Sequence, residues 1–367
     1  MKKRVTAILT EYRLNSHAEV IVGRLLGELG YEPQVEVVSL YADQFPDNDM
    51  IRELAARHGI PLCATIEEAV AYGAPERKVD GIVVIGEHGN YPWNEKEQRL
   101  YPRYRFMKQV VAAMDRYGIR APIFLDKHFS YDNGEARWIY DEVKRRGIPF
   151  MAGSSIPYTD AVPAYDPACL QGARTIFVVS HGGRESYGFH GMEVLQSLAE
   201  RRRGAETGVA SVRALAGEEM WAAMDRGEWP EALMMRAIAC DPNLSGRHPR
   251  NECPAPALFI VRYHDGLTGY VAQLDRFAAK WSYAVQDDAG NGIAAYCDTD
   301  TGRPYRHFAK LTALMEKMIV HGKLPCRIER NLLTTYLINT AMESLFLNRP
   351  LSLPALTVAY KPANDIA

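Results

Sequence analysis

The first part of the chain alternates between uninterrupted apolar runs and segments with helical periodicity. Strands are predicted where apolar residues run without a break, at 5–9, 35–41, 61–64, 79–86, 122–126 and 148–154. Helices are predicted where apolar residues recur every three or four positions, at 16–30, 51–57, from 65 onward, 103–117 and 135–146. Two capping boxes, Ser16 with Glu19 and Thr65 with Glu68, mark helix starts. This alternation predicts a parallel sheet covered on both faces.

The pattern changes after about residue 155. A strand is predicted at 174–182 and a helix at 190–200. Further strands with short turns are predicted at 207–215, 257–266, 268–275, 280–290 and 292–300, and helices at 307–320 and 328–347. The fold class is therefore α/β: a Rossmann-like domain at 1–155, then an α+β domain at 156–367 with a largely antiparallel sheet. The C-terminal helix and tail are expected to pack back on the first domain, and the cleft between the domains is the expected site.

Composition narrows the class of partner. The formal net charge is −2 and the sequence pI is about 6.6, which gives no electrostatic reason to expect nucleic acid or an anionic membrane as a partner. The six cysteines form no CxxC pair, so we expect reduced thiols in a cytoplasmic protein. No apolar run is long enough to span a bilayer. A small molecule is the expected partner.

Titratable residues stand where several of the predicted strands end. Glu11 and Asp43 follow the first two strands, and the pairs or runs 87–88 and 126–128 follow later ones. In an open parallel sheet, ligands bind outside the carboxyl ends of the strands, where the strand order reverses. The sequence therefore predicts a reaction centre along this edge.

The order of elements resembles the Gfo/Idh/MocA oxidoreductases over nearly the whole chain. The segment 5–17 occupies the place of that family's first strand and GxGxxGxxH, with His17 at its last histidine; LDKH at 125–128 occupies the place of the EKP motif; GFHGMEVL at 188–195 is similar to GxHxxDxL; and 340–354 is similar to the closing helix and strand. The resemblance implies a Rossmann domain followed by an open-faced sheet, and NAD(P)-dependent oxidation or reduction of sugars and polyols. It also implies a homo-oligomer formed through that open face.

The chain departs from this family at the coenzyme loop. In an ungapped register the three fingerprint glycines fall on Leu9, Glu11 and Leu14, which removes the tight turn and the close backbone approach that a diphosphate needs. A carboxylate at Glu11 would also repel a diphosphate. NAD(P) in its usual pose is therefore not favoured, and Glu11 and Asp43 are cofactor-binding candidates only if a dinucleotide binds. The family's catalytic Asp is replaced by Ser186, beside Glu185.

Proton transfer is the chemistry that the remaining residues favour. Lys127 follows a buried strand, and His190 is expected to face it across the cleft, so both can act as acid or base. The catalytic candidates are Lys127, His190, Glu185 and His181. The substrate-binding candidates, aromatic faces and polar groups typical of carbohydrate sites, are Glu87, Tyr91, Trp93, Asn94, Ser154 and Arg184.

The same edge is rich in metal-competent side chains, so a divalent metal is a further candidate cofactor. Its possible ligands are Glu11, Glu87, His88, Asp126, His128, His181 and His190. Three hypotheses remain open. The first is an acid–base enzyme of lyase, isomerase or hydratase type, with or without a metal, acting on a sugar, keto-sugar or polyol. The second is an NAD(P)-dependent sugar or polyol oxidoreductase with a diverged phosphate loop, and the third is a non-catalytic ligand-binding relative.

Overall fold

The first sheet is parallel throughout and has five strands in the order β2-β1-β3-β4-β5. The computed structural model describes residues 1–300 and 302–363. The five strands are β1 (Lys3–Leu9), β2 (Val35–Ala42), β3 (Gly81–Ile85), β4 (Ile123–Asp126) and β5 (Phe150–Gly153). The strand predicted at 61–64 is wrong, because this segment makes only an isolated bridge between Leu62 and Leu40.

The helices of this part lie between the strands, as predicted: α1 (His17–Leu25), α2 (Ile51–His58), α3 (Ile66–Val70), α4 (Arg103–Arg116) and α5 (Asn133–Arg146). The capping box of Thr65 with Glu68 is confirmed. At α1 the Ser16 hydroxyl accepts from the Glu19 amide, but the Glu19 carboxylate accepts from the Asn15 amide instead of the Ser16 amide.

The second sheet has seven strands in the order β6-β12-β11-β7-β10-β9-β8. These are β6 (Ala161–Val162), β7 (Thr175–Ser180), β8 (Val209–Ala216), β9 (Ala257–Tyr263), β10 (Thr268–Gln273), β11 (Ser282–Gln286) and β12 (Gly292–Cys297). Only the pairing of β7 with β10 is parallel among the described strand pairs of this sheet. The prediction of a largely antiparallel sheet after a Rossmann-like one is confirmed.

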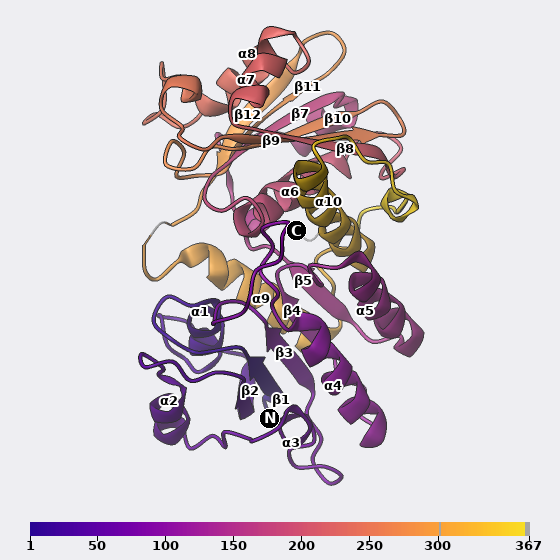
Figure 1. Cartoon of the computed structure of the whole chain (residues 1–367). Helices are drawn as coiled ribbons and strands as arrows, with labels where there is room; N and C mark the ends of the chain where they lie inside the picture. Colours follow the sequence, from indigo (N-terminus) through magenta and orange to yellow (C-terminus); the bar gives the residue numbers. More distant parts are fainter. Residues whose placement is uncertain (301, 364–367) are drawn as a thin grey trace.

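Helices lie on both faces of the second sheet (Figure 1). On the face toward the first sheet lie α6 (Ser186–Ala199) and α10 (Ile328–Leu347), and on the other face lie α7 (Glu218–Asp225) and α8 (Glu231–Ile238). Alternate side chains of β7 show this division, since Ile176 packs with the α6 side and Phe177 with the α7 and α8 side. The face that the family resemblance leaves open for a partner subunit therefore carries α7 and α8, and homo-oligomerisation stays a prediction.

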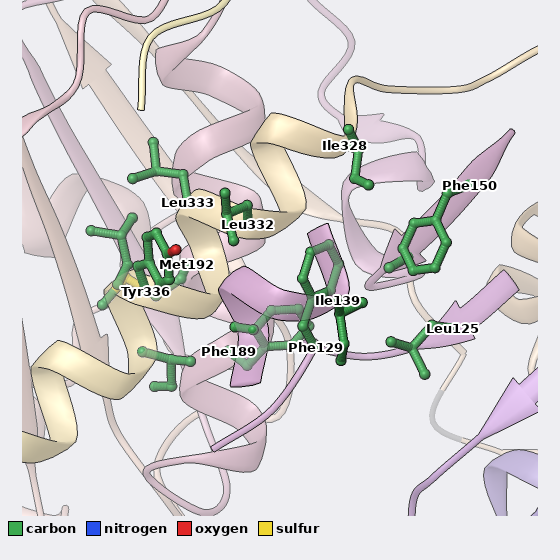
Figure 2. Close-up of a cluster of buried hydrophobic side chains, with 14 of the residues drawn as sticks. Leu125, Phe129, Ile139, Phe150, Phe189, Met192, Ile328, Leu332, Leu333 and Tyr336 are labelled. Carbon is green, nitrogen blue, oxygen red and sulfur yellow. The ribbon is translucent and has the colours of Figure 1, made fainter. Parts of the chain in front are cut away.

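A continuous apolar core joins the two sheets (Figure 2). Phe129 and Phe150 from the first sheet's region pack in one buried cluster with Phe189 of α6 and Tyr336 of α10. This cluster fixes the start of α6 against the carboxyl ends of β4 and β5. The helix α9 (Arg306–His321) returns to the first sheet, where it packs against α1. Within the described residues, no helix combines the length and the apolar character that crossing a membrane requires.

Candidate active site

The strand order reverses between β1 and β3, and this point is closed by hydrogen bonds. The Thr10 amide donates to the Ile85 carbonyl at 3.1 Å, and the Thr10 hydroxyl donates to the Glu87 carbonyl at 2.6 Å. Both strands therefore end together, and the residues that follow β3 are fixed at the crevice where ligands bind in such sheets. Glu87 is the first ionisable side chain after β3.

Glu87 is buried between two cations. Its Oε1 lies 3.2 Å from Lys127 Nζ, and its Oε2 accepts from Arg103 Nη2 at 2.5 Å. Gly86 makes this approach possible, because an added Cβ there would lie 2.6 Å from Arg103 Cγ. Burial alone would raise the pKa of Glu87, but Lys127 and Arg103 outweigh it and hold the pKa well below its usual range. Glu87 is consequently a carboxylate at neutral pH.

Two residues of this edge adopt left-handed backbone conformations that are unfavourable for side-chain-bearing residues. His88 has a φ of 70° and Lys127 a φ of 66°. Lys127 is fixed there by two backbone hydrogen bonds with Gly153, at 3.3 and 3.1 Å. Such outliers cost about 1–3 kcal/mol each and are concentrated at functional sites. The unfavourable backbone turns the Lys127 side chain toward Glu87 and toward the Ser186 carbonyl, which it reaches at 3.3 Å.

A second set of contacts fixes the start of α1. His17 Nδ1 lies 2.7 Å from Asp126 Oδ2, and the His17 amide donates to His88 Nδ1 at 3.4 Å. Burial, followed by the neighbouring His17, lowers the pKa of His88 to about 4, so His88 is neutral at pH 7 and accepts this hydrogen bond. Asp126 and His88 are thus engaged within the chain.

His190 faces this group from α6. Its Nδ1 lies 2.6 Å from Ser154 Oγ, which also accepts from the Ile156 amide at 3.0 Å. Burial, reinforced by the charge of Lys127, lowers the pKa of His190 well below its usual value, so the ring is neutral. A neutral imidazole whose position is fixed by a hydroxyl can accept a proton from a bound substrate.

These side chains surround an inner cavity of about 280 Å³ between the two sheets. Six of its lining residues are predicted site residues: Glu87, His88, Trp93, Lys127, Glu185 and His190. The other lining residues were not among the predicted site residues: His17, Arg99, Tyr101, Ser155, Ile156, Ser186, Tyr187, Trp281, His307 and Phe308. Buried atoms of this lining lack a hydrogen-bond partner among the described residues: Glu185 Oε1, Trp281 Nε1 and His307 Nδ1. These atoms are closed off from solvent in this conformation, so a ligand in the cavity reaches them only after a shift of the lining.

An outer cavity of about 360 Å³ adjoins the inner one. Trp93, Glu185 and Ser186 line both cavities. The outer cavity also contains two predicted substrate-binding residues, Asn94 and Arg184. The predicted site residues are therefore divided between two connected spaces.

Other predicted residues line neither cavity. Tyr91 donates to Asp43 at 2.7 Å, and Asp43 also binds Arg105 at 2.6 Å, so the expected ribose ligand is already occupied. Glu11 pairs with Arg13 at 2.7 Å, which offsets the charge that was expected to repel a diphosphate.

The remaining predicted residues support the lining from behind. Ser154 binds His190, and His128 lies 3.6 Å from Glu185 Oε1 and 3.5 Å from Arg103. His181 packs beside Trp281 with ring centroids 4.4 Å apart.

The structure does not assemble the predicted metal site. Among residues 1–300 and 302–363, no group of three histidine, cysteine, aspartate or glutamate side chains is placed to share a metal ion. The reason is visible in the pairing, since Glu87 faces Lys127 and Arg103 while Asp126 faces His17. The seven candidate ligands contact other groups of the protein or lie apart from one another. The geometry therefore gives no support to the metal hypothesis.

The loop before α1 uses its own side chains to satisfy its amides. The Arg13 and Glu19 amides donate to Ser16 Oγ at 3.3 and 3.1 Å, and the Asn15 amide donates to Glu19 Oε2 at 3.1 Å. The Ser16 amide donates to the Arg13 carbonyl, and the His17 amide to His88. In a dinucleotide-binding loop such amides point at the diphosphate. Here a phosphate could reach them only by displacing these groups.

Solved structures share this arrangement of elements. GenD2 from gentamicin A biosynthesis, solved in complex with NAD, is 13% identical with a TM-score of 0.63, covering 96% of this chain and 97% of that one. A probable dehydrogenase from Thermotoga maritima (13%, TM-score 0.61) and a myo-inositol dehydrogenase from Corynebacterium glutamicum ATCC 13032 (13%, TM-score 0.58) each match over 96% of this chain and 99% of theirs. No family model matches the chain, and no similar sequence was found among curated proteins. The chain has the fold of the Gfo/Idh/MocA-type dehydrogenases, which confirms the predicted resemblance at the level of fold.

Proposed function

We propose that this protein is an enzyme that acts on a sugar or polyol-like substrate by moving protons at a hydroxyl or carbonyl oxygen of the substrate or at the carbon next to its carbonyl. The observation that carries the proposal is the Lys127–Glu87 pair facing His190 across the inner cavity. The cavity volume of about 280 Å³ is near the lower end of small-molecule sites, roughly 300–1,000 Å³. Its lining combines the aromatic residues Trp93 and Trp281 with the polar residues Lys127 and Glu185, which suits a ligand that carries several hydroxyls.

Lys127 and His190 have distinct roles in this proposal. Glu87 orients the Lys127 amine, which binds the substrate oxygen and gives or takes its proton. His190, neutral and fixed by Ser154, exchanges a proton with a second position of the substrate. Arg103 keeps Glu87 ionised, so that Glu87 does not compete as a proton donor.

The structural neighbours favour oxidation or reduction as the reaction. GenD2 was solved with NAD, and two other neighbours are a scyllo-inositol dehydrogenase from Lactobacillus casei and a myo-inositol 2-dehydrogenase from Lactobacillus plantarum. NAD(P) is accordingly the coenzyme to test first. The loop before α1 does not fit its diphosphate in the usual pose, because Ser16, Glu19 and His88 occupy the amides that would bind it.

That misfit favours a second candidate, a coenzyme-independent elimination, isomerisation or hydration. Removal of a proton next to a carbonyl and its return elsewhere needs an acid and a base, which Lys127 and His190 supply. No oxidant enters such a reaction. It uses the same substrate class and the same two residues.

One experiment tests the proposal and separates the candidates. The protein is incubated in D₂O with a panel of monosaccharides, keto-sugars and polyols, with and without NAD(P)⁺, and C–H exchange and NAD(P)H absorbance are followed. Lys127→Met should lower turnover on any substrate found by about 10²–10⁴-fold, whereas Lys144→Met, an exposed lysine paired with Glu329, should not. Turnover only with NAD(P)⁺ identifies an oxidoreductase, and exchange without it identifies the second candidate. Unchanged turnover in Lys127→Met would refute the assignment.

A further inference from the structure

Trp93 is a large aromatic side chain exposed at the junction of the two cavities. The residue is 59% exposed, and it lines both the inner and the outer cavity. The Arg99 guanidinium lies 4.6 Å from the ring centroid and covers one side of the ring. An exposed tryptophan leaves apolar surface in water, and a well-ordered one at a cavity mouth is typical of a stacking platform for a ligand.

The loop around Trp93 is ordered by its own hydrogen bonds. Trp93 and Arg99 form an antiparallel bridge, and the Asn94 amide donates to the Gln98 carbonyl at 3.0 Å. The Asn94 side chain also donates to Gln98 Oε1 at 3.1 Å, and Gln98 in turn binds Asn339 of α10 at 3.0 Å. The exposed ring is therefore held in position before any ligand arrives, so stacking on it costs little conformational entropy.

Glu185 lines both cavities. This side chain is only 4% exposed, and its Oε2 accepts from the Arg99 amide at 2.9 Å. Its Oε1 has no hydrogen-bond partner among the described residues, since His128 Nε2 lies 3.6 Å away. A buried carboxylate oxygen without a donor is unfavourable by about 1–3 kcal/mol or more. Through its other oxygen, Glu185 joins the wall shared by the two cavities to the backbone of Arg99, and so to the loop that carries Trp93.

We propose that the substrate is a glycoside with at least two sugar rings, and this rests on the proposed function. One ring occupies the inner cavity beside Lys127, and the second lies in the outer cavity against Trp93. A flat apolar face bordered by Asn94 and by the Arg184–Glu97 ion pair at 3.2 Å suits a pyranose ring. The outer cavity, about 360 Å³, gives this second ring as much room as the first.

The test compares disaccharides with the monosaccharides of which they are made. Binding of cellobiose, maltose, lactose and trehalose, and of their constituent monosaccharides, is measured by calorimetry and saturation-transfer NMR. We expect one disaccharide to bind about 10-fold more tightly than its monosaccharides. Trp93→Ala should abolish that difference by weakening disaccharide binding more than monosaccharide binding, while Trp93→Phe should retain most of it. Phe346→Ala, a substitution of another exposed aromatic (50% exposed) on α10, should change neither affinity.

The outcomes separate this inference from the proposed function. Monosaccharide binding that is lost in Lys127→Met, with no disaccharide advantage and no effect of Trp93→Ala, would overturn the two-ring substrate and keep the proposed function. Absence of binding by any sugar of the panel would overturn both.

Discussion

Glu87→Gln is the substitution that most directly tests the buried charge cluster. It preserves the shape of the side chain but removes the negative charge between Lys127 and Arg103, both of which are almost fully buried. Breaking a buried ion pair by removing one partner destabilises a protein by about 3–5 kcal/mol, because the other charge is left uncompensated. Two cations are left here, so we expect a loss of at least this size in the free energy of unfolding.

The assay is urea unfolding at pH 7.5, followed by circular dichroism, with Glu67→Gln as the matched control. Glu67 pairs with Arg116 at 2.6 Å, but the two side chains are 44% and 69% exposed, so its loss should cost under about 1 kcal/mol. Lys127→Met combined with Glu87→Gln should be less destabilised than the sum of the single variants by about 1–3 kcal/mol, because one unpaired cation is removed. Equal losses for Glu87→Gln and Glu67→Gln would refute the argument.

The other predictions concern pH and backbone. Burial lowers the pKa values of three histidines to about 4, namely His88, His181 and His307. Their pKa values in the folded protein lie below the unfolded value of about 6.5, so their contribution to the free energy of unfolding is complete above pH 6.5. This contribution should fall by roughly 1–2 kcal/mol per histidine between pH 7 and 5, because the unfolded chain binds protons that the folded protein does not. Urea midpoints that do not change over this range would contradict it. Gly153→Ala should cost roughly 2–4 kcal/mol in thermal unfolding, since φ is +111° and the new Cβ would lie 2.5 Å from Glu193 Oε2. Gly147→Ala, where φ is +62° and no atom lies within 4 Å of the new Cβ, should cost only about 1–2 kcal/mol, and equal losses would contradict the steric argument.

The fold was predictable because its strands and most helices carry strong periodicity. Errors arose where packing overrides local preference. The helix predicted at 190–200 begins at Ser186, and its first turns contain Gly188 and Gly191, which favour neither helix nor strand by propensity. The glycines are there because an added Cβ would lie 2.9 Å from Phe259 and 2.5 Å from Val271 respectively, so α6 lies against the sheet more closely than other residues allow.

The site was predictable only where an ionisable residue comes directly after a strand. Glu87 and Lys127 meet because β3 and β4 are adjacent and parallel, which the alternating pattern implies. Trp281 directly precedes β11 and His307 lies on α9; both line the inner cavity with Lys127, and no spacing in the sequence signals this. Glu11 has the expected position after β1, but the Arg13 side chain turns back to pair with it.

The occupied amides at the start of α1 and the charged cluster of Glu87, Lys127 and Arg103 have a common structural cause. In this fold the start of α1 offers free amides and a positive dipole end, which normally receive a diphosphate. Here Ser16, Glu19 and His88 satisfy those amides, and His88 is placed to do so by its left-handed backbone directly after Glu87. The turn that brings His88 to the helix start is therefore the turn that leaves Glu87 facing Lys127. A glycine-rich loop in this place would release His88 and alter the position of Glu87, so we expect the loop and the Glu87–Lys127 ion pair to change together and not independently.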